Sequence, residues 1–333
     1  MNAASIDLEN ELLKASWDCF PSEHLAVYLG IGEQDQRINT HSIFTRALLA
    51  DTLWPGMFDD LITEEFRFGI VMTWLLQELK AGATRIGLQD ELYASPSAER
   101  IPELVRQTAA WLQSADCPLP DYLGEALMFP NPDQPLWYLF EPALNTFVSL
   151  WSSRLDGLPS TPIRVLEIAC GSGNDYKTIL ACGLAAHIAY AGFDISWKNI
   201  HNAVDLYPEA EFFEASILNS GLPDNSFEYL FVHDMLGHLS PGGMEVALRE
   251  IMRIIRKEAW LHCYNVADID HHETHPFQSY YRNRLSIPRL SESLEKAGAS
   301  VEAITIPDML YRKFGYMPPY TSTSGTFIAR KQG

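Results

Sequence analysis

Residues 164–176 read RVLEIACGSGNDY, and this stretch decides the fold. It passes from branched apolar residues, which favour a buried strand, into a loop of small residues, with the carboxylate of Glu167 just before the turn. After a strand, a Gly-x-Gly turn lets backbone N–H groups approach an anion at the N-terminus of the following helix. The stretch therefore predicts a strand, a turn and a helix that together hold a nucleotide-like ligand.

Two ligands compete for this turn, a dinucleotide and S-adenosylmethionine. A dinucleotide turn built on Gly171 and Gly173 needs a third small residue for close packing of the helix on the strand, but that position is Tyr176. S-adenosylmethionine has a carboxylate, an ammonium and a sulfonium in place of a pyrophosphate, so it needs a protein carboxylate early in the loop. Glu167 supplies one, and the sequence favours S-adenosylmethionine.

After the turn, short apolar stretches alternate with helical segments, which argues for a parallel sheet. Between the fourth and fifth stretches, Ser240 can cap a helix that begins at Pro241. We therefore expect an α/β fold with a seven-stranded, mostly parallel, Rossmann-like sheet. The predicted strands are residues 163–168, 188–193, 210–213, 227–232, 259–266, 300–305 and 324–330.

The first part of the chain shows a helical pattern without a clear strand. Capping residues or a proline in the first turn open each predicted helix. The segment DGLPSTP, residues 156–162, separates this pattern from the alternating one. We therefore expect an all-helical domain over residues 1–156 and the sheet domain over residues 157–333. The predicted helices are residues 39–54, 63–80, 101–114 and 141–155.

The sequence VLEIACGSGN resembles the first motif of class I S-adenosylmethionine-dependent methyltransferases, usually Asp/Glu-x-Gly-x-Gly-x-Gly. Ala169 stands in place of the first glycine, and alanine has no easy access to a positive φ. YAGFDIS ends an apolar strand with Asp194, about twenty residues after the turn, where an acidic side chain can accept both ribose hydroxyls. The resemblance covers roughly residues 160–333 and implies a methyltransferase domain whose cofactor is S-adenosylmethionine.

Two further stretches carry the resemblance. FFEASILNSGLPDNSFEYLFV is similar to the third and fourth strands of the family, and Ser216, with Glu214 two residues away, takes the place of an Asp that usually meets the adenine amine. FEYLFVHDMLGHLSPGG is similar to the strand and loop that pass the transferable methyl. The implied catalytic residues are His233, His238 and Asp234, and the implied cofactor-binding residues are Glu167, Ala169, Gly171, Gly173, Asp194, Ile195, Ser216, Ile217 and His233.

One turn departs from the family pattern. The frequent Pro-Gly-Gly before the fifth strand is missing, and the sequence there reads RIIRKEAWLHCYNV. We expect a changed turn at this place within the same fold.

Charge and composition limit the partners. The chain has 24 Lys and Arg against 43 Asp and Glu, a net charge of −19, which repels a phosphate backbone, so we expect no nucleic-acid partner. The longest apolar run, residues 68–76, is about half of what a bilayer crossing needs, and the first residues lack a secretory signal. Five scattered cysteines fit a reducing compartment. We expect a soluble, cytoplasmic protein without a membrane partner.

In the stretch DIDHHETHPF, residues 268–277, four potential metal ligands lie close together: His271, His272, Glu273 and His275. A zinc-protease helix needs His-Glu-x-x-His, but counting from His272 the last position is Pro276, which also disfavours a helix. We expect no metal here. Our interpretation is a solvated loop after the fifth strand that borders the substrate.

The function that the resemblance implies is methyl transfer to a small-molecule acceptor, by an in-line displacement that needs the reacting atoms at about 3–3.5 Å. If the acceptor is a hydroxyl or a protonated amine, His233 or His238 is the candidate general base. The helical domain is expected to cover the carboxyl edge of the sheet and select the acceptor, or to form a homodimer interface. Two alternatives stay open: transfer of another alkyl group, such as aminopropyl, and a non-catalytic regulator that binds the same cofactor.

Overall fold

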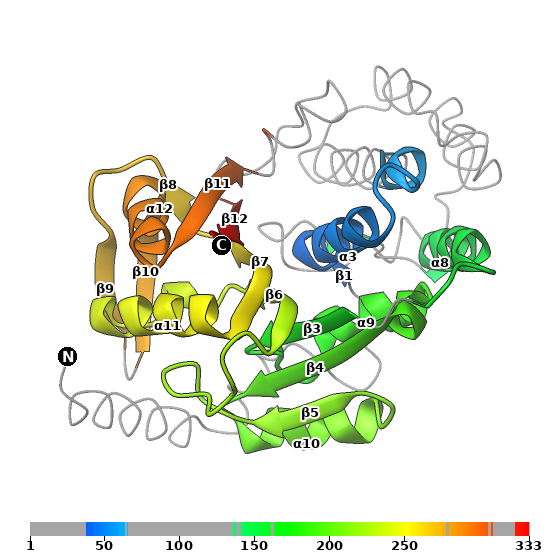
Figure 1. Cartoon of the computed structure of the whole chain (residues 1–333), viewed down its shortest axis with the longest axis horizontal. Helices are drawn as coiled ribbons and strands as arrows, with labels where there is room; N and C mark the ends of the chain where they lie inside the picture. The colour runs from blue at the N-terminus through cyan, green and yellow to red at the C-terminus, as the bar shows by residue number, and fades with distance from the viewer. Residues whose placement is uncertain are drawn as a thin grey trace, which may run out of the picture.

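The structure is a computed structural model, and it describes eight parts of the chain (Figure 1). The predicted helix over 101–114, most of the one over 63–80 and the apolar run over 68–76 lie outside the described residues. No helix in the described part is long and apolar enough to span a bilayer. The described residues are 38–63, 65, 136–137, 141–160, 163–277, 280–305, 308 and 324–332.

The predicted seven-stranded sheet is confirmed, and its strand order is β11-β12-β7-β6-β3-β4-β5. Neighbours from β7 to β5 run parallel, whereas β12 is antiparallel to both β7 and β11. The carboxyl ends of the parallel strands therefore meet at one edge, where ligands of such sheets bind. The strands are β3 (Ile163–Ile168), β4 (Ile188–Asp194), β5 (Glu211–Glu214), β6 (Phe227–His233), β7 (Ile255–Cys263), β11 (Ala299–Thr305) and β12 (Gly325–Lys331).

Helices cover both faces of this sheet (Figure 1). Leu166 and Ile168 of β3 share a buried core with apolar residues of α11 and α12. Side chains alternate along a strand, so Glu167 points to the other face, where α9 and α10 lie. The helices are α9 (Asn174–Ala181), α10 (Trp197–Leu206), α11 (Pro241–Ile254) and α12 (Ile287–Lys296), with short 3₁₀ turns η2 (Leu184–His187) and η3 (Leu236–His238).

The start of α11 follows the prediction, and its end explains the changed turn. Ser240 Oγ accepts a hydrogen bond from Gly243 N at 3.0 Å, and Pro241 occupies the first turn. At the other end, β7 begins at Ile255 directly after α11 ends at Ile254. The predicted fifth strand therefore starts four residues too late, because no Pro-Gly-Gly turn separates helix from strand.

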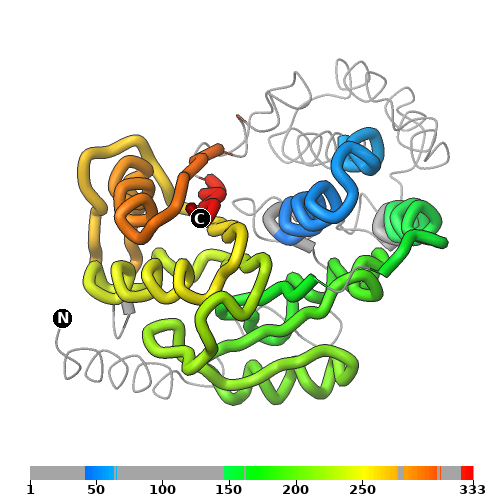
Figure 2. The backbone as a smooth tube through the Cα atoms, viewed as in Figure 1, coloured from blue at the N-terminus to red at the C-terminus, as the bar shows by residue number. Residues whose placement is uncertain are grey.

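A small second sheet follows β7, and it corrects our interpretation of residues 268–277. Strands β8 (Val266–Ala267), β9 (Glu273–Phe277) and β10 (Tyr280–Ser286) pair in the order β8-β10-β9. The interpretation of a solvated loop was wrong for 273–277, because these residues pair antiparallel with β10 as a hairpin. Figure 2 shows this segment on the side of the molecule away from α8. Within the described residues, no cluster of His, Cys, Asp and Glu is arranged to hold a metal.

The described part of the N-terminal region contains α3 (Thr40–Leu53) and α8 (Glu141–Leu155), as predicted. Two short strands, β1 (Ile38–Asn39) and β2 (Leu136–Trp137), were not predicted, because two residues show no periodicity. Arg46 of α3 forms a buried ion pair with Glu65, whose carboxylate also accepts a hydrogen bond from Trp151 Nε1 of α8 at 2.8 Å. The Glu65 carboxylate therefore links α3 to α8.

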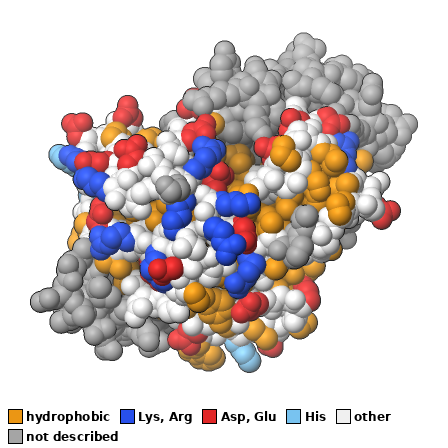
Figure 3. Space-filling model, in the orientation of Figure 1, with side chains coloured by type: hydrophobic (Ala, Val, Ile, Leu, Met, Phe, Trp, Pro, Cys, Tyr) orange, Lys and Arg blue, Asp and Glu red, His pale blue; other side chains and the backbone are white. Residues whose placement is uncertain are grey.

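Charged groups at the amino edge of the sheet are extensively paired. Figure 3 shows a face on which Lys and Arg side chains gather among carboxylates. Arg253 contacts Asp224 and Glu250, and Arg330 lies 2.9 Å from Glu258. The charges of these two arginines are therefore offset by neighbouring acids.

Candidate active site

The glycine turn connects β3 to α9 at the carboxyl edge of the sheet. Ala169 has φ 57°, Gly171 φ 55° and Gly173 φ 82°, so all three lie in the left-handed region. Alanine therefore adopts the conformation that the family motif assigns to glycine, at a cost of roughly 1–2 kcal/mol. The turn closes through a hydrogen bond from Gly173 N to Cys170 O at 2.9 Å.

The two glycines have different surroundings. A Cβ built on Gly173 would lie 2.8 Å from the ring of Tyr207, so close packing as well as the positive φ requires glycine there. A Cβ built on Gly171 would meet no atom within 4 Å among the described residues. The backbone at Gly171 is therefore open to close approach by a ligand.

Asp194, the last residue of β4, is fixed against the glycine turn. Its carboxylate accepts hydrogen bonds from Gly171 N at 3.0 Å, Ser196 N at 2.8 Å and Asn199 Nδ2 at 3.2 Å. Burial, with 5% of the residue exposed, raises the pKa of the carboxyl, although these donors lower it. The Ile195 N–H is a further donor to this carboxylate, so the protein already fills its roughly four acceptor positions, and the ribose hydroxyls of a ligand would share the oxygens with these donors.

Glu167 lies beneath the turn, with 2% of its surface exposed. The Tyr190 hydroxyl donates a hydrogen bond to its carboxylate. Burial, followed by the nearby charges of Asp175 and Asp194, raises the pKa of Glu167 well above its usual range. Three buried acids therefore converge under the turn, and a cation at this place would lower the pKa values of all three.

The residues predicted to meet the adenine lie beyond β5. Ser216 Oγ accepts a hydrogen bond from Leu218 N at 3.3 Å, which forms a local turn, and Ile217 is buried. Ile195 is half-buried directly after Asp194, and Glu214, the alternative polar residue, is exposed. The adenine contact stays a prediction.

His233 ends β6 and is held on both ring nitrogens. Nδ1 lies 3.0 Å from Asp175 Oδ2, and Nε2 lies 2.9 Å from the Tyr264 hydroxyl. Ser42 of α3 also donates a hydrogen bond to Asp175. We call Ser42, Asp175, His233 and Tyr264 the His233 cluster; its members come from α3, α9, β6 and the residue after β7's end.

The charges of Asp175 and His233 are coupled. Burial raises the pKa of Asp175, but the imidazole of His233 and the Ser42 hydroxyl lower it, and the net pKa is below the ordinary value. Burial lowers the pKa of His233, but Asp175 raises it more, and the net pKa is above the ordinary value. The arrangement therefore favours a carboxylate on Asp175 and retention of a proton by His233.

The other two predicted catalytic residues have weaker geometry. Asp234 has φ 51°, and its carboxylate accepts from Tyr264 N at 3.3 Å, so it shapes the loop. His238 Nδ1 lies 3.2 Å from Tyr281 O of β10, and Nε2 lies 3.8 Å from the Asp234 carboxylate. His238 is more exposed than His233, and the two predicted bases therefore occupy different environments.

Several residues of this edge were not predicted from the sequence. His262, on β7, is buried, and burial together with the charge of His233 lowers its pKa to about 3, so it is neutral. Its Nε2 lies 2.7 Å from Thr45 Oγ1 of α3, which places α3 on the carboxyl edge. Asp175 could have been noticed as an acid in the first turn of a helix, and Tyr264 as a polar residue just beyond a parallel strand.

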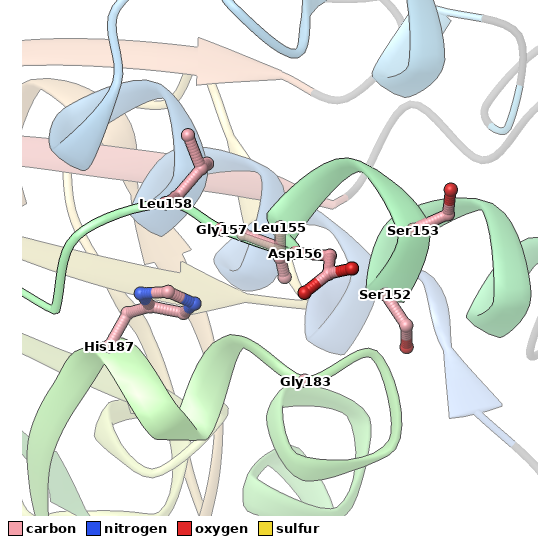
Figure 4. A pocket seen from close by; sticks show the side chains of 8 residues that line it. All are labelled: Ser152, Ser153, Leu155, Asp156, Gly157, Leu158, Gly183 and His187. Atoms are coloured by element: carbon pink, nitrogen blue, oxygen red, sulfur yellow. The ribbon is translucent and has the colours of Figure 1, made fainter.

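A surface pocket of about 510 Å³ lies elsewhere, between the end of α8 and η2 (Figure 4). Its lining residues precede β3 and β4 in the chain, so it lies at the amino edge of the sheet, away from the glycine turn. Its position excludes it as the predicted ligand site. The lining residues are Ser152, Ser153, Leu155, Asp156, Gly157, Leu158, Gly183 and His187.

Comparison with known proteins identifies one part of the chain. Residues 165–258 match the family model described as "Methyltransferase domain". No curated protein matches the sequence.

Solved structures resemble about half of the chain. A chain of the complex between the Haloferax volcanii Trm112 methyltransferase activator and a putative methyltransferase has 16% identity, covers 55% of this chain and 89% of that chain, and has a TM-score of 0.41. Burkholderia thailandensis 1,6-didemethyltoxoflavin-N1-methyltransferase was solved with bound 1,6-didemethyltoxoflavin and S-adenosylhomocysteine. It has 16% identity, the match covers 56% of this chain and 78% of that chain, and the TM-score is 0.41. A TehB-like S-adenosylmethionine-dependent methyltransferase from Corynebacterium glutamicum has 18% identity. The match covers 55% of this chain and 88% of that chain, and the TM-score is 0.38.

Proposed function

We propose that this chain, whose C-terminal half is a class I S-adenosylmethionine-dependent methyltransferase domain, transfers a methyl group to a small-molecule acceptor. The observation that carries the proposal is the position of Asp194. The Asp194 carboxylate lies 3.0 Å from Gly171 N. An acceptor for the ribose hydroxyls therefore lies beside the glycine turn, along which the amino-acid part of the cofactor is proposed to bind.

The residues of the edge fit this cofactor. Asp194 is proposed to accept the ribose hydroxyls, and Ile195, Ser216 and Ile217 to border the adenine. The buried acids Glu167 and Asp175 favour a positively charged ligand over a pyrophosphate. When bound, S-adenosylmethionine supplies a methyl group on a sulfonium, which a lone pair of the acceptor can attack.

A small acceptor is supported by access and by charge. The His233 side chain is 11% exposed, and α3 contacts the same edge through Ser42 and Thr45. An acceptor must therefore be small enough to reach a largely buried centre. The net charge of −19 disfavours nucleic acid as the acceptor.

Calorimetry and a transfer assay test the proposal. We expect S-adenosylmethionine and S-adenosylhomocysteine to bind more tightly than NAD, and Asp194→Asn to cost about 1–3 kcal/mol of that affinity, because a hydroxyl loses its charged acceptor. Incubation with methyl-labelled cofactor and a metabolite extract should then give a labelled small molecule.

Other outcomes of these two experiments contradict the proposal. Tighter binding of NAD would overturn the ligand assignment. If the cofactor is labelled in its aminopropyl carbons and the label appears in the product, the protein would be a different alkyl transferase. Cofactor binding without any product from the extract would indicate a regulator.

A further inference from the structure

The His233 cluster forms a continuous chain of hydrogen-bonding groups. Ser42 donates to Asp175, Asp175 lies 3.0 Å from His233 Nδ1, and His233 Nε2 lies 2.9 Å from the Tyr264 hydroxyl. A carboxylate on one imidazole nitrogen fixes the ring and the position of its proton, and leaves the other nitrogen to accept one. Asp175 therefore sets the direction in which His233 can move a proton.

The tautomer follows from these contacts. Asp175 is ionised and accepts the Nδ1 proton, so in a neutral ring Nε2 carries the lone pair. That lone pair faces the Tyr264 hydroxyl at 2.9 Å. A substrate proton therefore cannot reach Nε2 without passing through Tyr264 or displacing it.

Resting on the proposed function, we propose that the Tyr264 hydroxyl takes the proton of the methyl acceptor, while His233 receives the proton of Tyr264 at Nε2 and Asp175 acts as a positioning residue. The acceptor class that this relay serves must lose a proton on methylation, as a hydroxyl or a protonated amine does. A thioether would not need it.

The proton balance closes within the cluster. The acceptor's proton moves to the Tyr264 oxygen, the phenolic proton moves to Nε2, and the imidazolium is held by the Asp175 carboxylate. A concerted transfer leaves no free phenolate, whose ordinary pKa is about 10. The imidazolium returns its proton to water after the product leaves.

The charges around His233 favour the imidazolium that the proton transfer produces. The titratable groups that face it among the described residues are Asp175 on α9, Asp234 after β6, His262 on β7 and Tyr264. Both acids stabilise an imidazolium. His262 is neutral at physiological pH, with a ring centroid 6.0 Å away, so it does not repel the positive ring.

The kinetic test compares Tyr264→Phe with Tyr229→Phe, which removes the same hydroxyl from a half-buried tyrosine in the first half of β6. With the acceptor fraction from the extract, we expect Tyr264→Phe to lower kcat by about 10²- to 10⁴-fold and to leave calorimetric affinity for S-adenosylhomocysteine nearly unchanged. The loss should shrink at high pH, where the acceptor ionises unaided. Tyr229→Phe should retain kcat.

A second readout does not depend on activity. In the cofactor-free protein with ¹⁵N-labelled histidine, Tyr264→Phe should shift the Nε2 signal of His233, and Asp175→Asn should lower its pKa, because the charge that raises it is removed. Wild-type kcat in Tyr264→Phe, or unchanged His233 signals in both variants, would overturn the relay. Absence of product from the wild-type protein, with these signals shifted, would count against the proposed function instead.

Discussion

The carboxyl edge of the sheet carries two sites that are built in different ways. The glycine-turn site, Glu167, Ala169, Gly171, Gly173 and Asp194, lies within one β-α-β unit, and its contact between Gly171 and Asp194 spans 23 residues. In the His233 cluster, the contact between Ser42 and Asp175 spans 133 residues and that between Asp175 and His233 spans 58. Spacing along the chain therefore specifies the first site, whereas only the folded topology assembles the second.

The largest effect is expected from His233→Gln, which breaks the His233 cluster alone. Glutamine cannot accept a proton at the position of Nε2, so kcat should fall by about 10²- to 10⁴-fold with little change in cofactor affinity. His238→Gln is the matched variant, because His238 is half-buried on Tyr281 O and its Nε2 lies 3.8 Å from the Asp234 carboxylate, farther than Asp175 lies from His233. Its expected effect is mainly on KM for the acceptor.

Steady-state kinetics with the acceptor fraction, together with calorimetry on the cofactor, distinguish the two histidines. Equal losses of kcat in both variants would mean that the structure does not separate the two predicted bases. Full kcat in His233→Gln would remove proton transfer from the function of the cluster.

The same contrast explains how much could be predicted. Glu167, Gly171 and Asp194 could be placed because a turn and two strand ends have fixed spacings in a β-α-β unit. Asp175 and Tyr264 could not be paired with His233, because four connections between parallel strands, from β3 to β7, bring them together, and no sequence periodicity indicates which strand ends become neighbours. The hairpin of β9 and β10 was missed for another reason. Pro276 and the clustered histidines are typical of a loop, and only the pairing with β10 in the folded structure shows that residues 273–277 form an edge strand.

The second prediction tests the glycine-turn site through its packing. Gly173→Ala adds a Cβ 2.8 Å from the Tyr207 ring at φ 82°, so both overpacking and backbone strain oppose it. We expect a loss of about 2–5 kcal/mol in the free energy of unfolding. Gly171→Ala adds strain at φ 55° without a described neighbour, and about 1–2 kcal/mol is expected.

Urea unfolding of the two variants measures this difference. Gly171→Ala should weaken cofactor binding more than its stability loss suggests, since its Cβ occupies the open side of the turn. Equal unfolding free energies would show that Tyr207 moves aside and that close packing does not require Gly173.

The third prediction uses pH to sharpen the comparison, because Glu167 and Asp175 have pKa shifts of opposite sign. Glu167 has a raised pKa when folded, so above its usual value of 4.5 the folded protein holds a proton that the unfolded chain releases. Stability from this group therefore falls as pH rises, by at most about 1.4 kcal/mol per pH unit. Asp175 behaves oppositely: its contribution is lost as pH falls through its lowered pKa.

Glu167→Gln should remove the first of these slopes. Its unfolding free energy should increase relative to the wild type as pH rises from about 4.5, because a neutral amide still accepts the Tyr190 hydroxyl proton without the cost of a buried charge. Urea titrations between pH 4 and 8 measure this difference. A difference that stays constant with pH would mean that Glu167 is ionised with an ordinary pKa.

The smallest effect is expected from Ala169→Gly, which restores the glycine of the family motif. At φ 57° the Cβ of Ala169 costs roughly 1–2 kcal/mol, while glycine adds about 0.4–1 kcal/mol of unfolded-state entropy, so a net gain of about 0–1.6 kcal/mol is expected. Ala189→Gly, at an exposed position of β4, is the matched variant and should lose about 0.5–1 kcal/mol. Opposite signs in thermal unfolding would show that the turn, though it departs from the motif in sequence, keeps its backbone shape by absorbing strain. A loss in both variants would mean that the core contacts of the Ala169 methyl outweigh its strain, and that alanine stabilises this turn.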